Sequence, residues 1–301
     1  MRDITDKIHT LRYACATATV QVSQQSTIDA LLEKRVPKGD VFEMAKTAGL
    51  LGIKRTSDTI PDCHPLPVEF AALHFRVEGL SIILEVEVKT IYKTGVEVEA
   101  MYGATVAAVT VYDMLKPLDP HIEINAVKLL KKTGGKTQYG ELSQKKPRTA
   151  VLVCSDTVSQ GKKEDRAGKA IIAKLSSLEI PVEEYSVIPD EIDIIQSKVL
   201  QLEAADFQML IITGGTGLAP RDVTPEAVRP LLTREIPGIA EAIRAYGQQR
   251  TPYSMLSRSV VGYRNKLLIL ALPGSTKGAQ ESMDAVFPYL LHVFGAGKHV
   301  S

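Results

Sequence analysis

The pattern of hydrophobic and polar positions changes character about halfway along the 301-residue chain. In the first half, residues 41–53 carry apolar side chains at helical spacing behind Asp40, which predicts a helix with Asp40 as its N-cap. Two strands, a long helix and a last strand are then expected over 68–77, 80–91, 96–115 and 122–130. Helices combined with antiparallel hairpins predict an α+β layer.

The long helix expected over 96–115 is rich in small residues, namely Ala100, Gly103, Ala104, Ala107 and Ala108. Small side chains allow a helix to approach its neighbour closely. The neighbour could be the sheet of the same chain or a second subunit, and the pattern alone leaves both open.

The second half alternates strands and helices more regularly. Strands are expected over 150–154, 182–188, 208–213 and 267–272. Helices are expected over 165–177, 191–204, 239–246 and 278–293, with a further helix starting at Thr224. This alternation predicts a three-layer α/β domain with a mostly parallel sheet, whose ligands sit beyond the carboxyl ends of the strands.

A polar segment with no apolar period separates the two halves. We therefore predict a first domain over 1–140, a linker over 141–148 and a second domain over 149–301. The length agrees with two domains, because single cores rarely grow much beyond ~250–300 residues.

Composition restricts the function classes. The formal net charge is +1, Trp is absent, and aromatic residues make up 5% of the chain, which argues against a nucleic-acid partner. No apolar run is long enough for a membrane helix, and the N-terminus lacks the apolar core of a secretory signal. Three widely spaced cysteines form no disulfide framework. We expect a cytoplasmic protein without a membrane partner.

Asp113 and Lys116 stand three positions apart, so they share one face of the predicted helix. Such a pair is commonly a solvated surface contact. Here it follows a helix of small apolar residues, and a lysine beside apolar surface can have its pKa lowered, which suits acid or base chemistry.

Cys63 and His64 could be metal ligands, but no further cysteine has the spacing of a metal site. His64 could instead donate a hydrogen bond to an anionic substrate, or be an ordinary core histidine. Glu97 and Glu99 could orient a sugar or purine edge, or merely favour the start of a helix as acidic residues do.

As an ordered set, these segments resemble cyclic pyranopterin monophosphate synthase, an enzyme of molybdenum cofactor synthesis. The match comprises Lys38-Gly39-Asp40-Val41, Ala48-Gly49, Lys54-Arg55-Thr56-Ser57-Asp58, Ile60-Pro61, Cys63-His64-Pro65-Leu66, Thr94-Gly95-Val96-Glu97, Glu99-Ala100, Tyr112-Asp113-Met114, Lys116 and Gly134-Gly135-Lys136. It covers nearly all of residues 1–140 and implies a ferredoxin-like fold. The implied reaction rearranges a cyclised dihydro-GTP and expels pyrophosphate, without a tightly bound cofactor.

The resemblance also implies roles for individual residues. Asp113, Lys38 and Lys116 match the catalytic positions, and the substrate-binding candidates are Arg12, Lys54, Asp62, Cys63, His64, Glu97, Val98, Glu99 and Lys136. Arg12, Lys54 and Lys136 are phosphate or scaffold cations. Asp62 departs from the family pattern, which has an apolar residue there, and adds negative charge. Met101-Tyr102-Gly103 departs too. Members of the family form hexamers with sites between subunits.

In the second half, Thr213-Gly214-Gly215-Thr216-Gly217 follows a buried strand. Glycines let backbone N–H groups approach phosphate, and Thr224 with Pro225 predicts an N-cap that starts a helix nearby. A second turn carries Gly274 and Ser275, with Ser275 or the next residue as a cap. Three acidic residues follow strands at the same sheet edge, and this favours a metal–nucleotide site: Asp156, Asp190 and Asp222.

This second ordered set looks like the molybdopterin-binding fold. It comprises Ser155-Asp156, Asp165, Ile188-Pro189-Asp190, the glycine loop, Arg221-Asp222-Val223-Thr224-Pro225-Glu226-Ala227, Pro237-Gly238, Ser257-Arg258 and Leu272-Pro273-Gly274-Ser275. The nearest activity is molybdopterin adenylyltransferase.

By that resemblance Asp190 and Asp222 are the essential acids and candidate Mg²⁺ ligands. Gly214, Gly215, Thr216, Gly217, Gly274 and Ser275 would bind the pterin phosphate and ATP. Members commonly form trimers, so a homo-oligomer built on hexamers or trimers is expected. Two alternatives stay open: the second domain only carries molybdopterin, or the first is a degenerate oligomerisation scaffold.

Overall fold

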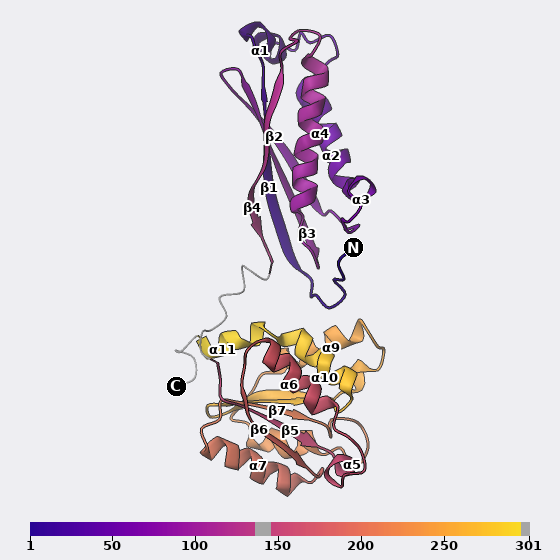
Figure 1. Cartoon of the computed structure of the whole chain (residues 1–301), viewed down its shortest axis with the longest axis vertical. Coiled ribbons are helices and arrows are strands. Elements are labelled where there is room, and N and C mark those ends of the chain that lie inside the picture. Colours follow the sequence, from indigo (N-terminus) through magenta and orange to yellow (C-terminus); the bar gives the residue numbers. More distant parts are fainter. Residues whose placement is uncertain (136–145, 296–301) are drawn as a thin grey trace. The chain divides into compact units, whose positions relative to one another are not determined.

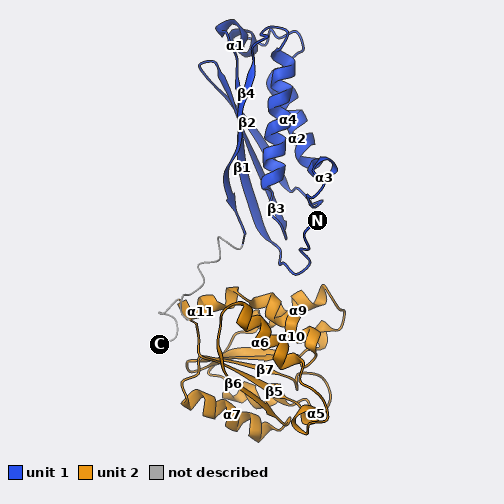
Figure 2. Ribbon diagram, viewed as in Figure 1, with its two compact units in different colours: residues 1–139 blue, residues 140–301 orange. Residues whose placement is uncertain are grey.

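The computed structural model describes residues 1–135 and 146–295. The chain divides into two compact units, Met1–Tyr139 and Gly140–Ser301 (Figure 2). Most of the expected linker, residues 141–145, lies outside the described residues, so its bounds stay a prediction. Among the described residues, no helix combines the length and the apolar character needed to cross a membrane.

Unit 1 is an antiparallel sheet with helices on one face (Figure 1). Its strands, in sheet order β2-β3-β1-β4, are β2 (Phe70–Glu78), β3 (Ser81–Tyr92), β1 (Thr10–Gln21) and β4 (Glu123–Thr133). Its helices are α1 (Gln25–Leu32), α2 (Val41–Lys54), α3 (Thr56–Thr59) and α4 (Glu97–Leu115). This order is that of a ferredoxin-like fold, and the α+β prediction is confirmed. The central strand β1 and helix α1 are elements that the sequence pattern did not predict.

Helix α4 packs its small residues within its own unit, on β1 and α2. Ala100, Ala104, Ala107 and Ala108 are fully buried, so the first of the two packing alternatives is the observed one. A Cβ on Gly103 would stand 2.5 Å from Ile53 of α2, so only glycine permits this helix–helix distance. Asp40 accepts a hydrogen bond of 3.2 Å from the Glu43 amide, which confirms it as the N-cap of α2.

Unit 2 is a three-layer α/β domain, as predicted. Its sheet order is β6 (Val182–Ile188), β5 (Thr149–Cys154), β7 (Met209–Thr213), β10 (Leu267–Leu272), β9 (Val260–Arg264) and β8 (Arg234–Glu235). The first four strands are parallel, and β9 and β8 are antiparallel additions that the sequence pattern missed.

The sheet of unit 2 lies between two helical layers (Figure 1). One layer contains α6 (Ala167–Ser177), α9 (Pro237–Gln248) and α10 (Thr276–Val286), and the other contains α7 (Ile192–Ala204) with α8 (Thr224–Val228). The remaining short helices are α5 (Asp156–Ser159), η1 (Arg229–Leu231), η2 (Ser254–Leu256), η3 (Tyr289–Leu291) and α11 (His292–Gly295).

Two details of the predicted helices are wrong. Helix α10 ends at Val286 instead of running to 293, because Pro288 has no N–H with which to continue the helical ladder. The N-cap of α8 is Val223, and Thr224 makes no capping hydrogen bond. With five residues, α8 is also too short to place a strong helix dipole beside the glycine loop.

Candidate functional site

The three residues of unit 1 that were predicted to be catalytic meet at the C-terminal end of α4. Lys38, in the loop before α2, donates from Nζ to Asp113 Oδ2 at 2.7 Å and to the Asp113 carbonyl oxygen at 2.8 Å. Lys116 places its Nζ 2.8 Å from Asp113 Oδ1. One carboxylate is thus held between two ammonium groups, and all three side chains remain accessible to solvent.

This arrangement fixes the protonation states of the cluster. Hydrogen bonds from Lys116 and Lys38 lower the pKa of the Asp113 carboxyl to about 2. The same contact raises the pKa of Lys116, so the expectation of a lowered lysine pKa is wrong. The reason is that the lysine faces an ionised carboxylate, whose attraction outweighs the small loss of solvation.

A second cluster lies at the other end of α4. The Cys63 thiol donates to Glu99 Oε1 at 3.3 Å, and Glu99 Oε2 is buried without any hydrogen-bond partner. Burial raises the pKa of Glu99, and burial with the Glu99 contact raises the pKa of Cys63 to about 12. Glu99 and Asp113 stand on one helix, roughly 21 Å apart at 1.5 Å per residue. Within one copy of the chain the two clusters therefore do not form a single site.

The other predicted residues of unit 1 are scattered around these clusters. Asp62 pairs with the Met1 ammonium group at 2.9 Å, and the partly exposed His64 places Nε2 2.8 Å from the Arg2 carbonyl oxygen. Asp62 is largely exposed, and its carboxylate is neutralised locally by that ammonium group.

The remaining candidates differ in how firmly they are held. Arg12 is buried and donates to the Tyr92 and Lys93 carbonyl oxygens, which is the geometry of a scaffold cation. Glu97 lies 3.5 Å from the Lys132 ammonium group. Val98 and Lys54 are exposed, and Lys136 lies outside the described residues.

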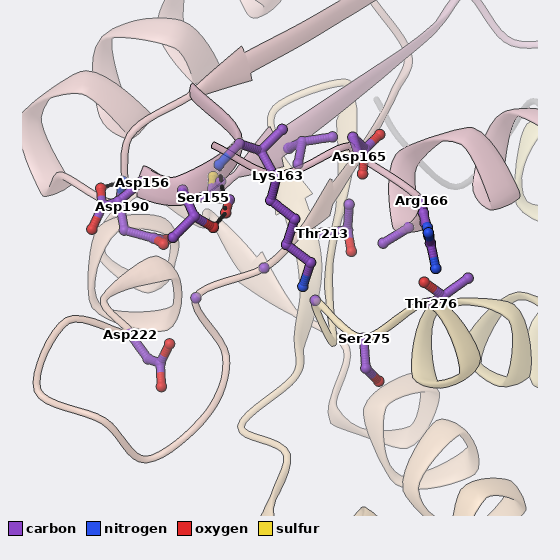
Figure 3. A pocket seen from close by; sticks show the side chains of 18 of the residues that line it. Ser155, Asp156, Lys163, Asp165, Arg166, Asp190, Thr213, Asp222, Ser275 and Thr276 are labelled. Carbon is purple, nitrogen blue, oxygen red and sulfur yellow. Dashed lines mark hydrogen bonds between the residues drawn. The ribbon is translucent and has the colours of Figure 1, made fainter. Parts of the chain in front are cut away.

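In unit 2, a cavity of about 430 Å³ lies beyond the carboxyl ends of the parallel strands (Figure 3). Seven of the predicted residues line it, namely Asp156, Asp190, Asp222, Gly214, Gly215, Gly274 and Ser275. Thr216 and Gly217 belong to the same loop but are not among its lining residues. The topological expectation that these segments meet at one sheet edge is therefore confirmed.

The glycine turns permit backbone contacts that side chains would block. Gly214 has a φ of +107°, and a Cβ there would stand 2.0 Å from the Cys154 carbonyl oxygen. Gly215 has a φ of +62°, and its Cβ would stand 2.4 Å from Asp190 Oδ1 and 2.3 Å from Thr224 Oγ1. The absence of a side chain thus leaves space directly beside two polar oxygens.

Those two oxygens, Asp190 Oδ1 and Thr224 Oγ1, are buried and have no hydrogen-bond partner. Burial, followed by the charges of Asp156 and Asp222, raises the pKa of Asp190 to about 6. Buried polar atoms without partners are rare in folded proteins and are frequently found where a ligand or an ion binds. The carboxylate edge of the cavity is therefore built to receive a positive group.

This edge suits an Mg²⁺ ion that is held jointly by protein carboxylates and by a bound nucleotide. Within the described ranges, no three His, Cys, Asp or Glu side chains are close enough to hold a metal by themselves. Mg²⁺ in nucleotide sites is usually held by one or two carboxylates together with phosphate oxygens. The oxygens of Asp190 and Asp222 suit such a partial set, which a nucleotide would complete.

The cations of the cavity were not predicted from the sequence. Lys163 and Arg166 line it from the loop between α5 and α6, and Arg221 lines it from the loop before α8. Figure 3 shows Lys163 extended across the cavity and Arg166 beside Thr276, away from Asp190. Their position after a parallel strand was the signal that could have identified them.

Arg258 fixes the loop that carries Gly217 and Asp222 through contacts of its guanidinium group. Its Nε donates to the Gly217 carbonyl oxygen at 2.7 Å, another guanidinium nitrogen donates to the Asp222 carbonyl oxygen, and a third contacts Glu226. Asp222 Oδ2 in turn accepts from the Ala219 amide at 2.9 Å. The guanidinium group thus fixes the backbone from which Asp222 projects.

Comparisons with known proteins match each unit separately. The MoaC family matches residues 1–135, and the probable molybdopterin binding domain matches residues 150–292. A cyclic pyranopterin monophosphate synthase of Syntrophomonas wolfei is 45% identical over 141 residues, which cover 46% of this chain and 89% of that protein.

Other relatives match the whole chain. A molybdenum cofactor biosynthesis bifunctional protein of Chlorobaculum tepidum is 37% identical over 294 residues, covering 98% of this chain and 93% of that protein. A protein of the same name from Synechococcus elongatus is 34% identical over 305 residues, covering 97% and 95% respectively. Since the similarity runs through both units and nearly the full length of these relatives, the chain belongs to the family of molybdenum cofactor biosynthesis bifunctional proteins.

Proposed function

We propose that unit 1 converts a cyclised dihydro-GTP to cyclic pyranopterin monophosphate and pyrophosphate. The observation that supports this reaction is the carboxylate of Asp113 held between Lys38 and Lys116. In the reaction, a substrate hydroxyl attacks the α-phosphorus, the bond to the β-phosphate breaks, and pyrophosphate leaves with the electron pair. The ammonium groups offset the charge that grows on the phosphate oxygens.

The protonation states indicate which role each residue has in the proposed reaction. With a pKa of about 2, Asp113 stays ionised near neutral pH and is a poor acid. It orients the two lysines and keeps Lys116 protonated, because the same contact raises the lysine's pKa. We assign proton donation to the lysines. The buried oxygen of Glu99 is assigned to binding the purine-derived rings.

We further propose that the complete site forms between two copies of the chain. The clusters at Asp113 and at Cys63 with Glu99 occupy opposite ends of α4, and a small substrate cannot span roughly 21 Å. Val98 and Val109 are exposed on α4, as expected for a helix face that a second copy covers. A hexamer or a trimer-based assembly would bring the end of one α4 to the start of another.

Complementation tests the shared site. Asp113→Ala and Glu99→Gln should each abolish pyrophosphate release when assayed alone. Co-expressed, they should recover part of the activity, because some interfaces combine an intact Glu99 with an intact Asp113. No recovery in mixed oligomers that mass spectrometry has verified would refute a site between copies.

For unit 2 we propose the Mg²⁺-dependent adenylation of molybdopterin. The observation that supports it is a cavity with carboxylates at one edge and with glycine amides, Lys163 and Arg166 elsewhere on its wall. The terminal phosphate oxygen of molybdopterin attacks the α-phosphorus of ATP, and a new phosphorus–oxygen bond forms. The α–β bond breaks and pyrophosphate leaves.

Each part of the cavity has a distinct task in this proposal. Asp190 and Asp222 would hold Mg²⁺, which supplies charge neutralisation for the triphosphate when it is bound. Gly214 and Gly215 bring backbone amides within reach of phosphate oxygens. Ser275 caps α10 and faces the same cavity, so it is assigned to the attacking phosphate. These substrates and the free cysteines of the described chain agree with a cytoplasmic location.

Paired variants of the full chain test both activities. Asp113→Ala should abolish pyrophosphate release from the cyclised dihydro-GTP and leave adenylation intact. Asp222→Ala should have the opposite effect, measured as AMP transferred from ATP to molybdopterin. If the wild type binds molybdopterin but transfers no AMP at millimolar ATP, unit 2 is a carrier and the adenylation proposal is wrong.

A further inference from the structure

A second cavity of about 310 Å³ opens next to the first, between α9, η2 and α10. Ser275 is common to the linings of both cavities. The second cavity is also lined by Tyr253, Ser254, Ser257, Glu281 and Ser282. A ligand with its phosphate at Ser275 can therefore extend into a space rich in hydroxyl groups and away from the carboxylates of the first cavity.

Glu281 is the unusual member of this lining. Its side chain is only 13% exposed, yet among the described residues its carboxylate accepts no hydrogen bond. The nearest cation is Lys277, whose Nζ is 3.8 Å away and whose side chain is 73% exposed. With only this exposed lysine as a neighbouring cation, the carboxylate oxygens of Glu281 can accept hydrogen bonds from a ligand in the cavity.

The hydroxyl groups around Glu281 do not supply them. Ser282 donates to the Gly278 carbonyl oxygen at 2.7 Å, and Ser254 donates to the Arg244 carbonyl oxygen at 3.2 Å. Ser257 shares its hydrogen bond with Ser259. The serines near Glu281 are thus engaged with other groups, and both carboxylate oxygens stay available.

We infer that the second cavity binds the ring system of the pterin and that Glu281 recognises its amino-pyrimidinone edge. That edge presents two adjacent N–H donors, the ring N3–H and the 2-amino group, which match the two oxygens of a carboxylate. This inference rests on the proposed adenylation of molybdopterin and names the residue that selects its acceptor.

The spacing of Ser275 and Glu281 along α10 agrees with the size of the pterin. Ser275 and Glu281 are six positions apart, so they are separated by roughly 9 Å along the helix axis. In a three-ring pyranopterin, the phosphate and the amino edge stand at opposite ends of the molecule. The phosphate would lie at the N-terminus of α10, where helix amides favour an anion, and the amino edge would lie about one and two-thirds turns further on.

Kinetics of Glu281→Gln test the inference in the full chain. The amide replaces one acceptor by a donor and keeps the shape of the side chain. We expect the KM for molybdopterin to rise about tenfold or more, as loss of a charged hydrogen-bond pair predicts. The KM for ATP should stay within twofold, which also shows that the variant is folded. Glu241→Gln, which changes an exposed glutamate of α9 outside the cavity lining, is the matched control, and an equal effect from it would overturn the inference.

A binding assay separates this inference from the proposed function. 6-Hydroxymethylpterin and its lumazine analogue, which has a 2-oxo group in place of the 2-amino group, are titrated by fluorescence. The wild type should prefer the pterin and Glu281→Gln should lose that preference. Equal binding of both compounds to the wild type would overturn the inference. A wild type that prefers the pterin but transfers no AMP would refute adenylation and leave the inference standing.

Discussion

We predict that Asp190, which is a proposed Mg²⁺ ligand of unit 2, lowers the free energy of unfolding of that unit. Its carboxyl is partly buried, one oxygen has no hydrogen-bond partner, and the carboxylates of Asp156 and Asp222 line the same cavity. Burial and these charges raise its pKa from 3.8 to about 6. At about 1.36 kcal/mol per pKa unit, that rise corresponds to about 3 kcal/mol lost on folding at pH 8. Because solvent still reaches part of the carboxyl, we expect about 1–2 kcal/mol.

The sign follows from proton binding. The folded chain holds this proton more tightly than the unfolded chain, so Asp190 costs nothing below about pH 4. The cost grows as the pH rises toward the folded pKa of about 6, and it is complete above that value. Asp190→Asn should therefore stabilise unit 2 fully at pH 8, by about half as much at pH 5, and should abolish adenylation.

Differential scanning calorimetry of the full chain measures this effect, with the transition of unit 2 assigned by its shift with Mg-ATP. We expect Asp190→Asn to raise the Tm by about 2–8 °C at pH 8. Asp193→Asn is the matched control, since Asp193 is exposed in the first turn of α7 and its charge favours that helix. Its Tm should fall slightly. A lower Tm for Asp190→Asn, or a gain independent of pH, would refute the reasoning.

Three further predictions concern the cations of unit 2. Lys163→Gln should lower kcat/KM for adenylation about tenfold, equivalent to about 1.4 kcal/mol, whereas Lys162→Gln, in the same loop but outside the cavity lining, should change it less than twofold. Arg258→Lys should lower kcat about tenfold with little change in the KM for molybdopterin, because lysine lacks the fork that bonds the Gly217 and Asp222 carbonyl oxygens. If the variant loses thermal stability along with kcat, Arg258 has only a structural role. EDTA should stop AMP transfer and spare pyrophosphate release by unit 1, and loss of both activities would contradict the separate assignments.

The limits of sequence reasoning are clearest at β1. The middle of its buried face carries Ala14, Ala16 and Ala18, and alanine has little preference for strands, so the hydrophobic alternation that would mark the central strand of unit 1 is weak. These alanines are small because α4, itself rich in small residues, packs closely on them. The signal for β1 is therefore a fit between two distant segments, which a local pattern cannot contain.

The candidate site of unit 2 could be predicted more fully than that of unit 1. Parallel strands bring their carboxyl ends to one edge, so topology alone places Asp156, Asp190 and Asp222 along one cavity. In unit 1, helical spacing predicted that Asp113 and Lys116 share one face of α4. It could not add Lys38, whose contact with Asp113 depends on where the loop before α2 lies.

Charge explains why one chain would hold two sites with different requirements. In unit 1, Asp113 neutralises only one of the two ammonium groups, Lys38 and Lys116, so the cluster is left with a positive charge that suits a triphosphate directly. In unit 2, the carboxylates gather at one edge and leave Asp190 with a raised pKa, so an anionic nucleotide would be repelled there unless a cation arrives with it. In the proposed reaction, the phosphate of molybdopterin would meet the other wall, where Ser275 and α10 favour an anion without a metal. On this proposal the two phosphates of the adenylation reaction would be attracted by different means, which would keep donor and acceptor apart until both are bound.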